Sequence, residues 1–256
     1  GNILAEAKIE SWSESVGVND PDPTVLRPHK WSPIVGMEAD NSVITNNNKI
    51  QVINDGQGMK ALNNSVATNN GDILITSKTN NEAGEHIDWN YHVIGMELKD
   101  SVGINNGNII ITGSAEHKGV SLNKNSNFTN KGKIEVDTEN EFARGISEDT
   151  YSSEVLEKEI VNEGLIRVFA SKTDKESTSP SLGEAIGVAI NRDFINKGDI
   201  YTETKDGSAI GVDSRVNKRS VVNSTNGKII VVGDNAIGIK ANNETYGSSE
   251  ILGKVS

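Results

Sequence analysis

The chain has 256 residues, of which 34% are hydrophobic and only 4% aromatic, and it contains no cysteine. The absence of thiols excludes disulfides, cysteine nucleophiles and thiolate metal sites. Its 25 basic and 36 acidic side chains give a formal net charge of -11 at pH 7, which disfavours nucleic acid and anionic lipid heads as partners. No stretch approaches the roughly 20 apolar residues that cross a bilayer, so we do not expect this segment to insert into a membrane.

Residues 1–32 fit the pattern of the remaining chain poorly, and we expect them to form an irregular segment or one eroded coil. From residue 33 to residue 256, two short motifs alternate. The first is Asn-x-Gly-x-Ile, as in NNGDI from Asn69, and the second is a glycine followed by Met, Val or Ile. The glycines of the second motif are Gly36, Gly58, Gly95, Gly119, Gly145, Gly187, Gly211 and Gly238. One copy of each motif per unit is typical of a solenoid, and the unequal spacing indicates inserted segments.

Each unit contains three short strand patterns. After the Asn-x-Gly motif, apolar and polar residues alternate, so that Ile73 and Ile75 face one way and Asp72 the other. A second strand follows the Gly-Met type motif with Met59 facing inward, and a third runs up to the asparagine with Ala67 facing inward. A sandwich or propeller would need hairpin turns, which these repeats lack. We therefore predict an all-β fold, a parallel β-helix (solenoid) with three strands per coil and loop insertions.

The repeated asparagine has a structural explanation. Stacked coils would place equivalent side-chain amides above one another, where they hydrogen-bond from coil to coil. The predicted ladder consists of Asn46, Asn69, Asn105, Asn130, Asn162 and Asn196. In the last copy, TNGKI, Thr225 is expected in the asparagine position. The glycine two residues after each asparagine is expected to adopt a positive φ at the corner.

Repeats such as NEGLIRV from Asn162 and NAIGI from Asn235 follow the pattern N-x-G-x-I-x-V and A-x-G-[IVM]. They resemble the passenger domains of Gram-negative type V autotransporters, large surface adhesins in particular, over roughly Pro33 to the end. The resemblance implies a right-handed β-helix stalk at the cell surface or in the extracellular space. It also implies anchoring to the outer membrane through a translocator barrel absent from this chain. Since neither end shows a capping helix, we expect the chain to be a fragment of a longer solenoid.

The leading functional hypothesis is a non-enzymatic adhesin segment that binds a protein or glycan on a host-cell or bacterial surface. One alternative is a carbohydrate-active β-helix enzyme, a lyase or hydrolase, and another is an inert stalk. Such enzymes need closely placed carboxylates, and the outward column of the long strand lacks them. Its neighbours Glu135 and Arg167 are predicted to form a cross-strand ion pair. No catalytic residue, metal site or cofactor is assigned; His86 and His92 lack a recognised metal-ligand spacing.

The insertion from Ser77 to His92 is the candidate ligand-binding loop. It combines Trp89 and Tyr91 with Glu85 and Asp88. Aromatic rings stack on apolar sugar faces and carboxylates accept hydrogen bonds from hydroxyls, which suits a glycan. The alternative is that the tryptophan folds back over the coil. Two further insertions are expected at 148–159 and 171–184.

Overall fold

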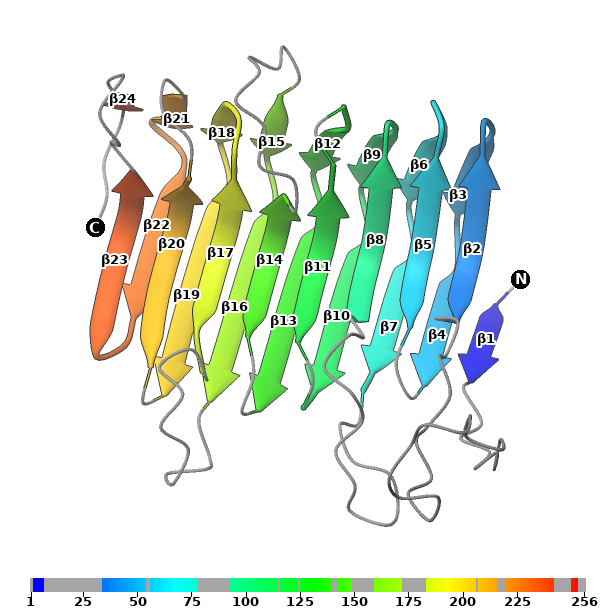
Figure 1. Cartoon of the computed structure of the whole chain (residues 1–256), viewed down its shortest axis with the longest axis horizontal. Helices are drawn as coiled ribbons and strands as arrows, with labels where there is room; N and C mark the ends of the chain where they lie inside the picture. The colour runs from blue at the N-terminus through cyan, green and yellow to red at the C-terminus, as the bar shows by residue number, and fades with distance from the viewer. Residues whose placement is uncertain are drawn as a thin grey trace, which may run out of the picture.

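The computed structural model describes residues 2–6, 34–53, 56–77, 93–114, 116–123, 125–139, 142–148, 159–171, 183–205, 207–215, 220–241 and 250–252. These residues form 24 strands in three parallel sheets of eight strands each. Successive strands pass from sheet A to sheet B to sheet C and back, so three consecutive strands make one coil and eight coils stack side by side (Figure 1). The parallel pairing confirms the predicted parallel β-helix.

Each sheet collects every third strand. Sheet A consists of β1 (Ile3–Glu6), β4 (Lys49–Ile53), β7 (Asp72–Thr76), β10 (Asn108–Gly113), β13 (Lys133–Glu139), β16 (Leu165–Ser171), β19 (Asp199–Lys205) and β22 (Lys228–Val232). Sheet B consists of β2 (Val35–Asp40), β5 (Gln57–Leu62), β8 (Val93–Lys99), β11 (His117–Leu122), β14 (Ala143–Glu148), β17 (Ala185–Ile190), β20 (Ser208–Ser214) and β23 (Asn235–Ala241). Sheet C consists of β3 (Val43–Asn46), β6 (Val66–Asn69), β9 (Val102–Asn105), β12 (Asn127–Asn130), β15 (Ile160–Asn162), β18 (Phe194–Asn196), β21 (Ser220–Asn223) and β24 (Glu250–Leu252).

The core is a set of apolar columns that run through the stack. In sheet A the register pairs Ile73 with Ile109 and Ile109 with Ile134, and all three are fully buried. The alternate residues Asp72 and Lys133 lie on the outer face and are partly exposed. Burial of matched β-branched residues in every coil is the main stabilising contribution of such a stack. The predicted strand phase is therefore confirmed.

The asparagine ladder is present and one coil longer than predicted. Each Nδ2 donates a hydrogen bond to Oδ1 of the next asparagine, with N···O distances of 2.7 or 2.8 Å. The members are Asn46, Asn69, Asn105, Asn130, Asn162, Asn196 and Asn223. Placing Thr225 in this column was wrong, because Asn196 pairs with Asn223 while Asp199 pairs with Lys228. The connection from Asn223 to Lys228 is two residues longer than the equivalent connection from Asn196 to Asp199, and Thr225 lies in its turn.

The glycines of the Asn-x-Gly motif, which lie at the corners between sheets C and A, are required for a different reason from the one predicted. Among the described glycines, positive φ occurs at Gly56, Gly113 and Gly183, and none of these is a corner glycine. A Cβ on Gly107 would lie 2.0 Å from the carbonyl oxygen of Gly71 in the preceding coil. The same approach recurs along the column, so glycine is required because neighbouring backbones come too close for a side chain.

The glycines of the second motif form another column, in sheet B, and they bring the backbone of sheet B close to the side chains of sheet A. A Cβ on Gly58 would lie 2.3 Å from Cγ2 of Ile73 in sheet A and 2.7 Å from the carbonyl oxygen of Gly95 in the following coil. Sheet B therefore crosses directly over the first isoleucine column of sheet A. Small and β-branched side chains suit this narrow part of the interior, and the fully buried rings of Phe128 and Phe194 come from sheet C instead.

Candidate functional site

The predicted ligand-binding residues Glu85, Asp88, Trp89 and Tyr91 lie outside the described residues. The chain connections of their segment are nevertheless defined. Segments 7–33, 78–92 and 172–182 each join a strand of sheet A to the next strand of sheet B, in the first, third and sixth coils. The strand ends that flank all three segments lie at the same corner of the stack, along the lower edge in Figure 1. The insertion predicted at 148–159 begins after β14 and joins sheet B to sheet C, so it leaves a different corner. Insertions at the corners leave the stacked strands undisturbed.

The outer face of sheet A carries a continuous column of side chains. Its members in coil order are Gln51, Leu74, Ile110, Glu135, Arg167, Tyr201 and Ile230. The predicted ion pair is confirmed, since Nη1 of Arg167 lies 2.9 Å from Oε1 of Glu135. Burial by itself raises the pKa of Glu135, but Lys133 and Arg167 outweigh burial and hold that pKa below its ordinary value. The column thus shows a carboxylate neutralised by two cations rather than a pair of carboxylates poised for acid–base catalysis.

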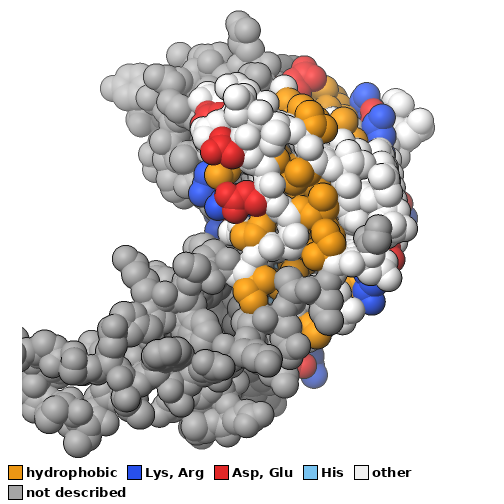
Figure 2. All heavy atoms as spheres, turned by 90° about the vertical axis from the view of Figure 1, so that its right-hand side faces the viewer, with side chains coloured by type: hydrophobic (Ala, Val, Ile, Leu, Met, Phe, Trp, Pro, Cys, Tyr) orange, Lys and Arg blue, Asp and Glu red, His pale blue; other side chains and the backbone are white. Residues whose placement is uncertain are grey.

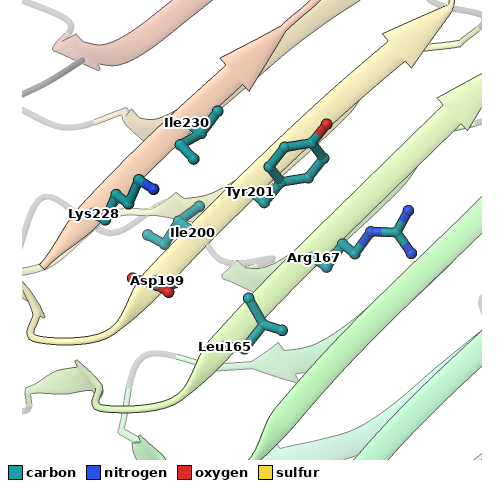
Figure 3. A pocket seen from close by; sticks show the side chains of 7 residues that line it. All are labelled: Leu165, Arg167, Asp199, Ile200, Tyr201, Lys228 and Ile230. Atoms are coloured by element: carbon teal, nitrogen blue, oxygen red, sulfur yellow. The ribbon is translucent and has the colours of Figure 1, made fainter.

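A shallow depression of about 300 Å³ lies at the carboxy-terminal end of this column (Figure 3). It is lined by Leu165, Arg167, Asp199, Ile200, Tyr201, Lys228 and Ile230. The Tyr201 hydroxyl donates a hydrogen bond to Oε2 of Glu203 at 2.8 Å. This bond, together with some burial, raises the pKa of Tyr201, so the phenol stays protonated at neutral pH. The depression places an aromatic ring and aliphatic side chains beside charged groups, and Asp199 is the one carboxylate among its lining residues.

A buried serine and histidine lie close together at the start of the candidate loop. Ser77 Oγ is 2.5 Å from Nε2 of His117, whose Nδ1 is 3.0 Å from the carbonyl oxygen of Asp137. A carbonyl only accepts, so Nδ1 carries the hydrogen and Nε2 accepts from the serine. Desolvation lowers the pKa of His117 to about 4, partly opposed by the Asp137 hydrogen bond. Because Ser77 is 3% and His117 0% exposed, the pair links coils and presents no face to a substrate.

Sequence reasoning missed the role of this histidine. The register places His117 between Val93 and Ala143, both fully buried. The aligned repeats would have revealed an imidazole in an apolar column, because the flanking copies carry Val and Ala at that position.

A second buried polar pair occupies the core. Glu148 takes the position of Leu122 in the neighbouring coil, and its carboxylate forms an ion pair with Arg192, both with fully buried side chains. The arginine also donates to the carbonyl oxygens of Ser126 and Asn123, at 2.5 and 2.7 Å. This network joins turns from three coils. It satisfies the buried charges that an isolated glutamate would leave unpaired, so it serves the fold.

No group of three or more His, Asp or Glu side chains in the described ranges is placed to hold a metal ion. His86 and His92 lie outside those ranges. The described part of the chain also contains no helix of the length and apolarity that crossing a membrane requires. Comparison with protein-family models, with curated proteins and with solved structures finds no match.

Proposed function

We propose that this chain is a non-enzymatic segment of a cell-surface adhesin, in which a β-solenoid presents inserted segments to a protein or glycan on another cell. The observation that carries the proposal is the position of the insertions. Segments 7–33, 78–92 and 172–182 all depart from the corner between sheets A and B. Three insertions at one corner can be displayed together while the core columns remain continuous, whereas segments 149–158 and 242–249 connect sheet B to sheet C at another corner.

The chemistry of the described residues supports a binding role over catalysis. The two buried pairs, Ser77 with His117 and Glu148 with Arg192, are enclosed by the fold and hold coils together. On the outer face of sheet A, the carboxylate of Glu135 forms ion pairs with both Lys133 and Arg167. The repeat pattern resembles autotransporter passengers, so the proposed location is the cell surface, with attachment to the outer membrane supplied by a part of the protein outside this chain.

The test measures binding and stability on one purified variant. Trp89→Ala combined with Tyr91→Ala should weaken attachment to host cells or to a glycan array while the unfolding midpoint stays nearly unchanged. Tyr201→Ala is the matched control, because it removes an aromatic ring from the outer face of sheet A, away from the corner that bears the insertions.

Three results would count against the proposal. Unchanged binding with a loss of about 3 kcal/mol or more in unfolding free energy would mean that the two aromatic rings cover the coil. Absence of binding by the wild-type chain to any cell or glycan would favour an inert stalk. Release of new reducing ends from polysaccharides would favour an enzyme.

A further inference from the structure

The outer face of sheet A carries apolar side chains that the core does not use. Viewed from the side that bears β1 and β2, the apolar atoms form a stripe through the molecule and most charged side chains lie to either side of it (Figure 2). The outward column of sheet A departs from that arrangement, because it contains four partly exposed apolar or aromatic residues: Leu74, Ile110, Tyr201 and Ile230. The face therefore offers two apolar pairs, one on each side of the Glu135–Arg167 ion pair.

The order of side chains in this column is self-complementary. From the third coil to the eighth, the column reads Leu, Ile, Glu, Arg, Tyr and Ile. If a second column with the reversed coil order is laid against it, each member meets a residue of suitable chemistry. The aligned pairs are Glu135 with Arg167, Ile110 with Tyr201, and Leu74 with Ile230. Opposite charges meet at the centre and apolar groups meet on both sides of them.

We propose that two copies of this chain pack through the outer faces of their sheets A. The two-fold axis runs parallel to the strands, between the fifth and sixth coils. This rotation turns the two faces toward each other, keeps the strand positions aligned and reverses the order of the coils. The occupant of the face is a second copy, because the column itself supplies the complementary side chain at each position. Since each copy offers the same patch, the contact is isologous and closes at a dimer.

The charges select this position of the axis. Two residues earlier on the strands, the same alignment places Asp72 opposite Lys228 of the other copy. Within the outward columns from the third coil to the eighth, it brings no like charges together. An axis through the fifth coil would instead place Lys133, Glu135 and Asp137 each against the same residue of the other copy. Like charges in contact are destabilising, so the alternation of charge favours the axis between the coils.

The size and openness of the face fit a reversible dimer. The six strands of sheet A from β7 to β22 contain five to seven residues each. At about 4.8 Å per coil and about 3.3 Å per residue, the face measures roughly 29 by 20 Å, at the small end of specific interfaces. The side chains of Glu135 and Arg167 are 21% and 44% exposed, so both charged groups keep a side open to the second copy. Sheets that pack face to face lie about 10 Å apart, which lets such side chains meet.

The experiment measures the mass of the full 256-residue chain against concentration by sedimentation velocity, with no ligand present. The wild type should change reversibly from monomer to dimer as the concentration rises. Glu135→Arg alone and Arg167→Glu alone should each weaken association by about tenfold or more, since like charges then meet at both symmetric contacts. An equimolar mixture of the two variants should form a heterodimer, because opposite charges then meet at both contacts.

Two further variants test the face itself. Ile110→Lys should also weaken association, because it replaces the apolar contact with Tyr201 of the other copy by a charge that loses water. Lys99→Glu is the matched control, since it reverses the charge of an exposed residue on sheet B, and it should leave the dimer unchanged. Circular dichroism of every variant shows whether the β-solenoid has formed.

A wild-type chain that stays monomeric at every concentration overturns the proposal. So does dimerisation of each charge variant alone to the wild-type extent, or a mixture that associates no better than its components. If a charge variant does not fold, Ile110→Lys decides the question in the same measurement. Association of that variant to the wild-type extent would place the contact on another face and overturn the proposal.

Discussion

Acid should destabilise this protein through His117, and the loss can be calculated. The imidazole is buried, with Ser77 on one nitrogen and the Asp137 carbonyl on the other. Its pKa falls from 6.5 to about 4 on folding, so the unfolded chain binds a proton that the folded chain rejects. The part of the unfolding free energy that depends on the neutral imidazole is fully present above the unfolded pKa of about 6.5 and is lost as pH falls to about 4. The two values differ by about 2.5, and each pH unit is worth about 1.4 kcal/mol, which gives a loss of about 3 kcal/mol.

The assay compares urea unfolding of the wild type and of His117→Asn at pH 7 and pH 4. Asparagine does not titrate in this range and can still donate to the Asp137 carbonyl. Burial raises the pKa of Asp137 and of Glu184, and both groups titrate in both proteins, so the difference between the variants isolates the histidine. The wild type should lose about 3 kcal/mol more than the variant between the two pH values. Parallel losses would show that His117 is accessible to protons in the folded state and refute the reasoning.

Two further predictions concern the core. Ile134→Asp should unfold several coils, because an unpaired charge buried in the sheet A column costs several kcal/mol. Lys133→Asp, one residue earlier, loses only a partly exposed ion pair with Glu135 and should cost about 1 kcal/mol. Equal damage from both in thermal unfolding would mean that the strand phase is wrong. Arg192→Met should cost about 3 to 5 kcal/mol in denaturant unfolding by leaving the Glu148 carboxylate buried and unpaired. Adding Glu148→Leu should recover most of that loss, and no recovery would show that the arginine acts through its carbonyl contacts instead.

The parts of the fold that repeat could be predicted from the sequence, and the parts that occur once could not. Eight copies of one pattern give many independent readings of which residues face inward, so the isoleucine columns and the asparagine ladder were predictable. Asn223 was missed because its corner is two residues longer, and a fixed Asn-x-Gly spacing cannot detect a local insertion. The corner glycines were recognised, but their cause depends on the distance between neighbouring backbones, which no single coil reveals.

The buried charges were unpredictable for a related reason. Glu148 was assigned to the insertion at 148–159, yet it ends β14 and fills a core position. Its partner Arg192 is 44 residues away, and only the stacking of coils brings the two together. The candidate loop with Trp89 and Tyr91 remains a prediction, since it lies outside the described residues.

The most direct test of the parallel stack uses distances between residues of one column. One outward column of sheet C contains Thr45, Val161 and Val222. Val161 lies four coils after Thr45, and Val222 lies six coils after it. The chain has no cysteine, so cysteines introduced at these positions carry spin labels without interference. At about 4.8 Å per coil, the separations from Thr45 should be about 19 Å to Val161 and about 29 Å to Val222. Double electron–electron resonance should show this increase of about 10 Å, and two distances that do not grow in proportion to the number of coils would contradict the stacked-coil fold.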